Sequence, residues 1–319
     1  MTKTRLIAAL AALLLLTGCA AGAGQQLPSG SSAPAAGSAS AEPASPAAAE
    51  ENAPETSAAE SAPEESAPEA SAAESAPEES PEPDPDWLLA EHIYSHRGAS
   101  GYEVEHTFAS YDLAIEQGSH NIEQDLVTSA DGTLYVSHDD SAQRIAGVNR
   151  DYSAMRDEEI SKLRTANGEG IHTMAEVFQR YGKDVTYLVE LKSPQGQAEP
   201  FARLVEDLGM EDNVIVQSFH PEALEEMERL LPEVPKLYLC RDQAGVNRAA
   251  AADYADIVCV KGPLMTETNL NKAHKEGKKF CVYWTEGEEV KKAIQMGVDC
   301  YFTNYTDTAL ELEREYRKQ

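Results

Sequence analysis

Residues 95–139 read SHRGASGYEVEHTFASYDLAIEQGSHNIEQDLVTSADGTLYVSHD. A strand and helix pattern begins here, together with a dense set of polar side chains. His96 and Arg97 follow one short apolar run, and Glu123 and Asp125 lie within a second run. Alternate residues of a strand face the same side, so both carboxylates point one way while the residue between them points the other. Two neighbouring carboxylates favour a hard divalent cation.

A solvated strand edge is the alternative interpretation of these two carboxylates. His96 and His138, with an Asp131-Gly132 turn, flank them within the length of one βαβ unit. The presence of these ionisable groups close to the two carboxylates favours a functional site suited to chemistry on a phosphate.

From residue 92 onward, strand-like apolar runs alternate with helical patterns that often end in glycine. Eight strand and helix units, with the first hairpin counted once, predict a (β/α)8 TIM barrel. An open doubly wound sheet would normally carry a glycine-rich phosphate loop after its first strand, and His96-Arg97-Gly98-Ala99-Ser100-Gly101 is not one. The expected strands are 92–95, 121–127 with its hairpin partner 133–137, 185–191, 213–219, 236–240, 256–260, 279–285 and 299–303.

Polar side chains recur where the expected strands end. In TIM barrels the carboxyl ends of the strands form the active-site mouth, so we expect these side chains to meet there. They are His96, Arg97, Glu123, Asp125, His138, Glu190, Lys192, Ser218, His220, Lys261, Trp284 and Asn304.

The amino-terminal residues 1–19 read MTKTRLIAALAALLLLTGC, a basic start and a short apolar run typical of an export signal. Their last four residues resemble a bacterial lipoprotein box, which implies cleavage before Cys19 and lipid attachment to it. An ordinary signal peptide with an incidental cysteine is the alternative. We expect an extracytoplasmic protein that is lipid-anchored to the bacterial cell membrane.

Residues 20–86 are almost entirely Ala, Ser, Pro, Glu and Gly, with fourteen acidic residues and no lysine or arginine. This composition cannot bury enough apolar surface to fold, so it predicts a disordered acidic linker, with a charged partner-binding tail as the alternative. Residues 87–319 then form the one folded domain.

The chain is strongly acidic, with a formal net charge of −29. No basic stripe is present to neutralise phosphates in number, which argues against nucleic acid or an anionic membrane surface as a partner. We therefore expect a small-molecule substrate, contact with the membrane through the lipid anchor only, and a monomer. Four cysteines, on expected inner strands, are interpreted as buried small hydrophobic residues with any pairing left open: Cys240, Cys259, Cys281 and Cys300.

The chain resembles the glycerophosphodiester phosphodiesterases, a family of barrel enzymes. The resemblance runs over residues 92–305 and rests on the following motifs: His96-Arg97-Gly98, Glu105 with Thr107, Glu123-Gln124-Asp125, Asp131-Gly132, His138-Asp139, Glu190-Leu191-Lys192, Ser218-Phe219, Trp284-Thr285, Gly297-Val298-Asp299 and Thr303. It implies metal binding by Glu123, Asp125 and Glu190, a catalytic pair formed by His96 and His138, and phosphate binding by Arg97 and Lys192.

The chain departs from the family pattern in three places. Val104 and His106 stand where proline and asparagine are usual, and Glu286-Gly287 stands where valine and asparagine are usual. None of these changes removes an implied ligand or catalytic histidine, so activity is expected while the preferred head group stays open.

The residues themselves favour metal-dependent chemistry on a phosphodiester, and the resemblance implies hydrolysis of a glycerophosphodiester to glycerol 3-phosphate and an alcohol. Three carboxylates suit one Ca2+ or Mg2+ ion better than zinc. Two histidines suit general acid and base roles, whose assignment stays open, as does the choice between water and a substrate hydroxyl as nucleophile. Trp284 is either a substrate-binding wall or barrel packing.

Two other functions compete with this interpretation. A phospholipase-like activity on lipid head groups would need an exposed apolar rim beside the mouth. A non-catalytic phosphodiester-binding lipoprotein would not need both His96 and His138.

Overall fold

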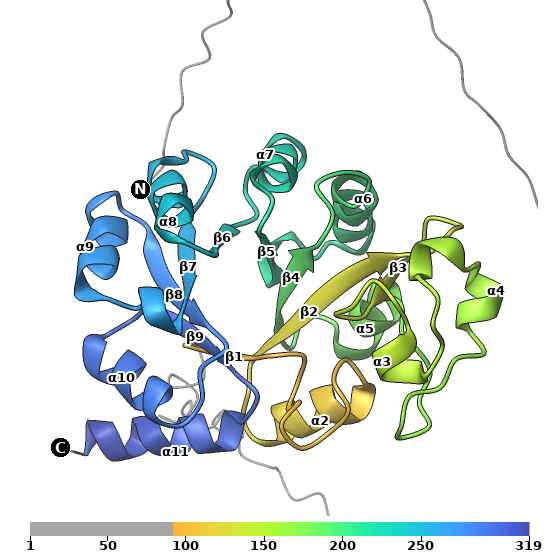
Figure 1. The fold of residues 1–319 in the computed structure, drawn as a ribbon, viewed down its shortest axis with the longest axis horizontal. Coiled ribbons are helices and arrows are strands. Elements are labelled where there is room, and N and C mark those ends of the chain that lie inside the picture. Colours follow the sequence, from red (N-terminus) through yellow and green to blue (C-terminus); the bar gives the residue numbers. More distant parts are fainter. Residues whose placement is uncertain (1–91, 319) are drawn as a thin grey trace, which may run out of the picture. The chain divides into compact units, whose positions relative to one another are not determined.

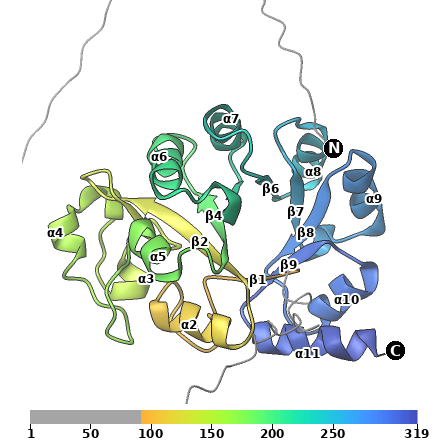
Figure 2. The same ribbon diagram turned by 180° about the vertical axis from the view of Figure 1, so that it is seen from behind.

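The computed structural model describes residues 92–318, and a closed barrel of eight parallel strands forms its centre. The sheet runs β1-β9-β8-β7-β6-β5-β4-β2-β3, and an additional β1–β2 pairing closes the ring. Figures 1 and 2 show the helices arranged outside the strands. The expected (β/α)8 TIM barrel is therefore confirmed. The signal, Cys19 and the linker lie outside the described residues.

The strands are β1 (Ile93–Ser95), β2 (Asn121–Thr128), β3 (Leu134–Val136), β4 (Thr186–Leu191), β5 (Val214–Ser218), β6 (Lys236–Cys240), β7 (Ile257–Lys261), β8 (Lys279–Tyr283) and β9 (Cys300–Thr303). The helices are α2 (Phe108–Glu116), α3 (Gln143–Ala146), α4 (Asp157–Ile160), α5 (Met174–Tyr181), α6 (Ala198–Leu208), α7 (Pro221–Leu230), α8 (Gln243–Ala251), α9 (Glu267–Lys275), α10 (Glu288–Met296) and α11 (Thr306–Arg317). Among the helices between residues 92 and 318, none is long and apolar enough to cross a membrane.

Strand β2 carries more partners than the other barrel strands. β4 pairs along one of its edges over residues 121–126, so β1 and β3 must share the opposite edge. β1 pairs at Ile122, near the start of β2, and antiparallel β3 takes the edge from Leu126 onward. The hairpin therefore extends β2 beyond the ring, and His138 follows directly behind it.

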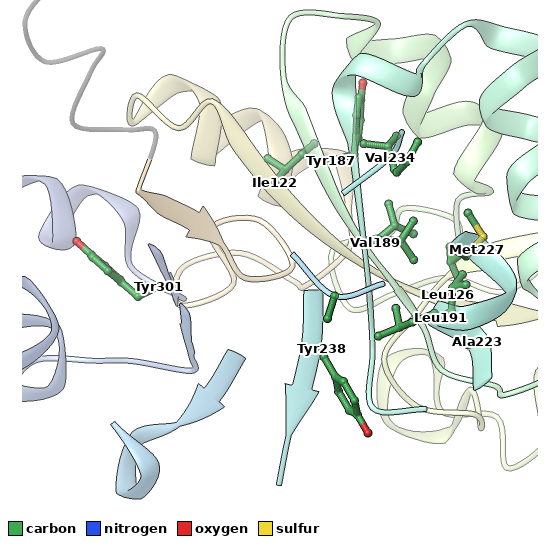
Figure 3. Close-up of a cluster of buried hydrophobic side chains, with 14 of the residues drawn as sticks. Ile122, Leu126, Tyr187, Val189, Leu191, Ala223, Met227, Val234, Tyr238 and Tyr301 are labelled. Carbon is green, nitrogen blue, oxygen red and sulfur yellow. The ribbon is translucent and has the colours of Figure 1, made fainter. Parts of the chain in front are cut away.

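Side chains on the outer face of the barrel pack against the helices. Ile122, Leu126, Val189 and Leu191 belong to one buried cluster with Met227 of α7 (Figure 3). Burial of such aliphatic side chains stabilises a fold by about 1.5–3 kcal/mol each. The two-residue period of the strands separates this layer from the barrel interior.

The barrel interior is filled below the mouth by a second apolar cluster. It consists of Tyr94, Leu188, Leu237, Leu239, Ile257, Cys259, Cys281, Cys300 and Phe302. Cys240 belongs to the outer layer instead. All four of these thiols are buried and free, as expected for small hydrophobic residues, and none of the four forms a disulfide.

Helix starts follow local capping signals. The side chain of Thr107 accepts a hydrogen bond from the backbone N–H of Ser110, and Thr173 forms a capping box with Glu176. Gly245 and Asn247 weaken the helical pattern of α8, yet Asp242 caps its start in the same way.

The segment between β3 and α5 is the largest departure from simple strand and helix alternation. It contains the four-residue helices α3 and α4 and packs around a small core of its own that includes Tyr135, Tyr152 and Met155. A bridge between Ser141 and Asp151 ties the segment together. This segment brings further polar side chains to the mouth of the barrel.

Candidate active site

A cavity of about 630 Å³ opens at the carboxyl ends of the strands, as expected for the active site of a TIM barrel. Most of the predicted mouth residues line it: His96, Arg97, Glu123, Asp125, His138, Glu190, Trp284 and Asn304. Ser218 is instead turned outward and donates to the Leu191 carbonyl, and Lys261 is exposed. His220 does not line the cavity either, and it is the residue before Pro221 at the start of α7.

The carboxylates come together through strand register. Asp125 on β2 pairs with Glu190 on β4, and Glu190 pairs in turn with Gln217 on β5. Gln217 Nε2 donates to Glu123 Oε1 at 2.9 Å. The backbone N–H of Arg97 donates to the other oxygen of Glu123 at 3.0 Å, so this buried carboxylate is held from two sides.

Two basic side chains reach the same carboxylates. Arg97 Nε lies 3.3 Å from Asp125 Oδ2. Lys192 Nζ lies 3.3 Å from Asp125 Oδ1 and 3.6 Å from Glu190 Oε1, although Lys192 does not line the cavity wall. Both predicted phosphate-binding residues are therefore beside the predicted metal ligands.

The electrostatics of the carboxylate cluster favour a bound cation. Burial and the neighbouring charge of Asp125 raise the pKa of Glu123 and of Glu190. Asp125 is also buried, but the hydrogen bond from His106 and the charge of Lys192 hold its pKa well below the usual range. Carboxylates that repel one another in a buried site are stabilised by a divalent cation, so the donor set fits one.

His106 belongs to this cluster, although the sequence indicated it only as a departure from the family pattern. Ligand atoms of His106, Glu123 and Asp125 all lie within 4.8 Å of one another, a group that does not include Glu190. His106 Nε2 is 3.0 Å from Asp125 Oδ2, and Nδ1 is 2.9 Å from the Tyr111 hydroxyl. The ring is buried, and burial lowers its pKa.

His96 is held in one tautomer by Asn304. Asn304 Nδ2 donates to Glu286 Oε1 at 2.7 Å, so its Oδ1 must face His96 Nδ1, which lies 2.7 Å away. Nδ1 therefore carries a proton, which it donates to the amide oxygen. Shielding from water and the positive charge of Arg97 lower the pKa of His96 to about 4, so Nε2 is an unprotonated base at neutral pH.

His138 is paired with a carboxylate instead. Its Nδ1 donates to Asp139 Oδ1 at 2.7 Å, and Arg144 Nε donates to the other oxygen of Asp139 at 2.6 Å. Arg144 also contacts both oxygens of Glu105 at 2.8 Å. The hydrogen bond from Arg144 lowers the pKa of Asp139 to about 2, which keeps this carboxylate charged next to the His138 ring.

Backbone strain is concentrated at the mouth. Within residues 92–318, the non-glycine residues with positive φ are Arg97 (60°), His106 (58°) and Trp284 (57°). Such conformations cost about 1–3 kcal/mol each and tend to mark functional sites. Gly98 has φ of 83°, and a Cβ there would lie 2.4 Å from Ser110 Oγ, so only glycine fits this turn.

Trp284 is 65% exposed at the rim of the cavity, so packing inside the barrel does not explain it. Gln217 and Arg144 also line the cavity, and neither was predicted as a site residue. Gln217 lies inside an apolar strand, where a single polar residue facing the interior was the available signal. Arg144 lies in a segment without a periodic pattern.

Comparisons with known proteins agree with this geometry. A family model described as the glycerophosphoryl diester phosphodiesterase family matches residues 96–308. The chain belongs to this family. The matched range starts at His96, the first residue of the family motif, and it contains every residue predicted for catalysis, metal binding and substrate binding.

Two curated members of the glycerophosphodiester phosphodiesterases are similar over most of their length. The protein of that name from Bacillus subtilis (strain 168) is 28% identical to the chain, and the match covers 73% of the chain and 88% of that protein. The protein of that name from Caldanaerobacter subterraneus subsp. tengcongensis is also 28% identical, and the match covers 70% of the chain and 98% of that protein. A crystal structure of the glycerophosphodiester phosphodiesterase from Agrobacterium tumefaciens str. C58 shares 25% identity at a TM-score of 0.62, covering 70% of this chain and 98% of that one.

Proposed function

We propose that this protein hydrolyses glycerophosphodiesters to glycerol 3-phosphate and an alcohol. The observation that carries the proposal is the cavity in which two differently paired histidines, His96 and His138, share one site with a buried carboxylate cluster. The family match supports a phosphodiester as substrate. A structure of an Oleispira antarctica phosphodiesterase, 22% identical with a TM-score of 0.62, is described as a complex with the product sn-glycerol-3-phosphate.

Glu123, Asp125 and Glu190 would hold one divalent cation, Ca2+ or Mg2+. Such a cation, when bound, offsets the negative charge of the phosphodiester and of its transition state. The oxygen-rich donor set suits these hard ions. Arg97 offers planar donors and Lys192 a point charge to the phosphate oxygens.

His96 is the proposed base. Its Nδ1 proton is donated to Asn304, so the Nε2 lone pair is available to accept a proton from the attacking hydroxyl. The lowered pKa keeps the ring neutral at neutral pH, which is the form that a base requires.

His138 is the proposed acid. The carboxylate of Asp139 accepts the Nδ1 proton at 2.7 Å and so orients the ring, which leaves Nε2 free to give a proton to the leaving alkoxide. Trp284, exposed at the rim, would contact the departing alcohol or the glycerol.

The test is turnover of a panel of glycerophosphodiesters with and without a chelator, with glycerol 3-phosphate measured as product. We expect release that stops on chelation and returns with Ca2+ or Mg2+. His96→Ala and His138→Ala should each lower turnover by about 10²–10⁴-fold.

A nitrophenyl diester separates the two histidine roles, because nitrophenolate leaves without a proton. It should rescue His138→Ala and not His96→Ala. Equal losses on both substrates in both variants would contradict the acid and base assignment. Absence of turnover on every diester, with cation binding intact, would favour a phosphodiester-binding lipoprotein instead, and turnover of intact phospholipids alone would favour the phospholipase-like function.

We further propose that the protein is a monomer anchored outside the cytoplasm through lipid on Cys19. The basic and apolar start of the chain and the Leu16-Thr17-Gly18-Cys19 sequence support the lipid anchor. Cys19→Ser should release the protein from the membrane fraction.

A further inference from the structure

His106 has no role in the proposed reaction, yet it is buried at 4% exposure against a proposed metal ligand. Its backbone has φ of 58°, a conformation that asparagine and histidine adopt more readily than most residues and that still carries a cost. The surrounding contacts therefore hold the ring in place against an unfavourable backbone.

The hydrogen bonds of three buried groups assign the proton on the ring. The Tyr111 hydroxyl and Asp125 contact opposite nitrogens of His106 at 2.9 and 3.0 Å. A carboxylate in the form that binds a cation can only accept a hydrogen bond, so Nε2 must donate to Asp125. In neutral imidazole Nδ1 is then the acceptor, and the Tyr111 hydroxyl donates to it.

The two oxygens of Asp125 have different surroundings. Oδ2 lies close to two donors, His106 Nε2 at 3.0 Å and Arg97 Nε at 3.3 Å. Oδ1 lies 3.3 Å from Lys192 Nζ, on a flexible side chain. Oδ1 is therefore the oxygen that a cation can reach with the smaller rearrangement.

We infer that His106 is a positioning residue and not itself a ligand of the divalent cation. The Tyr111 hydroxyl orients the ring of His106, and the ring orients Asp125 so that Oδ1 faces the cation. The proton on Nε2 occupies the site that a metal would need. The inference rests on the proposed cation site. It also explains why histidine is compatible with the position where the family usually has asparagine, since both side chains carry an N–H donor.

Calorimetric titration of the whole protein with Ca2+ tests the inference without any substrate. His106→Phe keeps a planar ring and removes the donor, and we expect its affinity to fall by about 10–100-fold. Tyr111→Phe removes only the relayed hydroxyl and should cause a smaller loss in a folded protein. His274→Phe is the matched control, because His274 Nε2 also pairs with a carboxylate, Asp299, at 2.7 Å but away from the cavity.

The visible spectrum of Co2+-loaded protein separates positioning from direct ligation. If His106 only positions Asp125, His106→Asn at saturating Co2+ keeps the spectrum of an oxygen-only site. A change in band position and intensity would overturn the inference, as would wild-type Ca2+ affinity in both His106→Phe and Tyr111→Phe. Absence of cation binding by the wild type would overturn it too. Cation binding that depends on His106 in a protein with no turnover would contradict the proposed function and leave the inference standing.

Discussion

Asn304 decides which nitrogen of His96 acts at the substrate. Its amide is oriented by Glu286 on one side, so its oxygen faces the histidine on the other. Asn304 therefore places a neutral hydrogen-bond acceptor, and no charged group, next to the proposed base. Shielding from water and the charge of Arg97 lower the pKa of His96, and the hydrogen bond to the neutral Asn304 offsets only part of this lowering.

The pH dependence of kcat/KM tests this arrangement. Protonation of His96 removes the base, so the rate falls as the pH drops through a pKa of about 4, and the measured limb belongs to the coupled pair of histidines. Asn304→Asp places a carboxylate against Nδ1, which favours the imidazolium and should move the acid limb upward by about 1 unit or more.

Asn271→Asp provides the control for that shift. Asn271 is exposed on α9 and outside the cavity, so its variant adds the same charge without touching His96. An acid limb that stays in place in Asn304→Asp would contradict the assigned tautomer and partner.

At the scale of elements, the segment between β3 and α5 completes the surroundings of His138, the proposed acid. Helix α3 carries Arg144, whose guanidinium joins Asp139 to Glu105 across the mouth. Glu105 is in turn 3.2 Å from Arg97. The short helix thus links the residues that follow β1 with the residues that follow β3.

Arg144→Ala should lower turnover of a natural diester by about 10-fold, a fraction of the 10²–10⁴-fold contribution of the acid itself. The reason is that Asp139 loses the donor that holds it against His138. The loss should shrink on a nitrophenyl diester, which needs no acid. The accompanying loss of thermal stability should be modest, because Arg144 itself is about half exposed and ion pairs of such residues contribute about 0–1 kcal/mol.

Arg150→Ala is the matched control in the same segment. Arg150 is exposed and pairs with Glu159 at 2.6 Å, away from the cavity. Equal losses of turnover in Arg144→Ala and Arg150→Ala would show that the segment acts only through its stability. A loss of turnover in Arg144→Ala that is equal on both substrates would show the same.

At the scale of the whole molecule, residues 92–318 contain every strand pair that closes the barrel and both apolar clusters of its core. A chain that begins at Trp87 should therefore fold cooperatively and hydrolyse a soluble diester at the same kcat/KM as a chain that begins at Ala20. The comparison is made by thermal unfolding and by turnover. Loss of activity in the shorter chain would mean that residues 20–86 contribute to the site.

Local patterns in the sequence were sufficient for the architecture and for most of the site. The two-residue period of the strands, glycines at helix ends and polar residues at strand ends predicted the barrel and placed His96, Glu123, Asp125 and His138 at its mouth. These features are local, because a strand displays its alternation and its final residue within one short stretch of chain. The predictions for residues 1–86 stay predictions.

Only the tertiary structure decided how the site residues pair. Gln217 meets Glu123 across ninety-four positions of sequence, and Arg144 meets Glu105 across thirty-nine. His106 reaches Asp125 from a turn with positive φ. Such contacts depend on the register between strands that are distant in the chain and on loop conformation, and neither produces a periodic signal along the sequence. The sequence by itself therefore predicted most of the chemical groups at the mouth, and the closing of the barrel decided which of them touch.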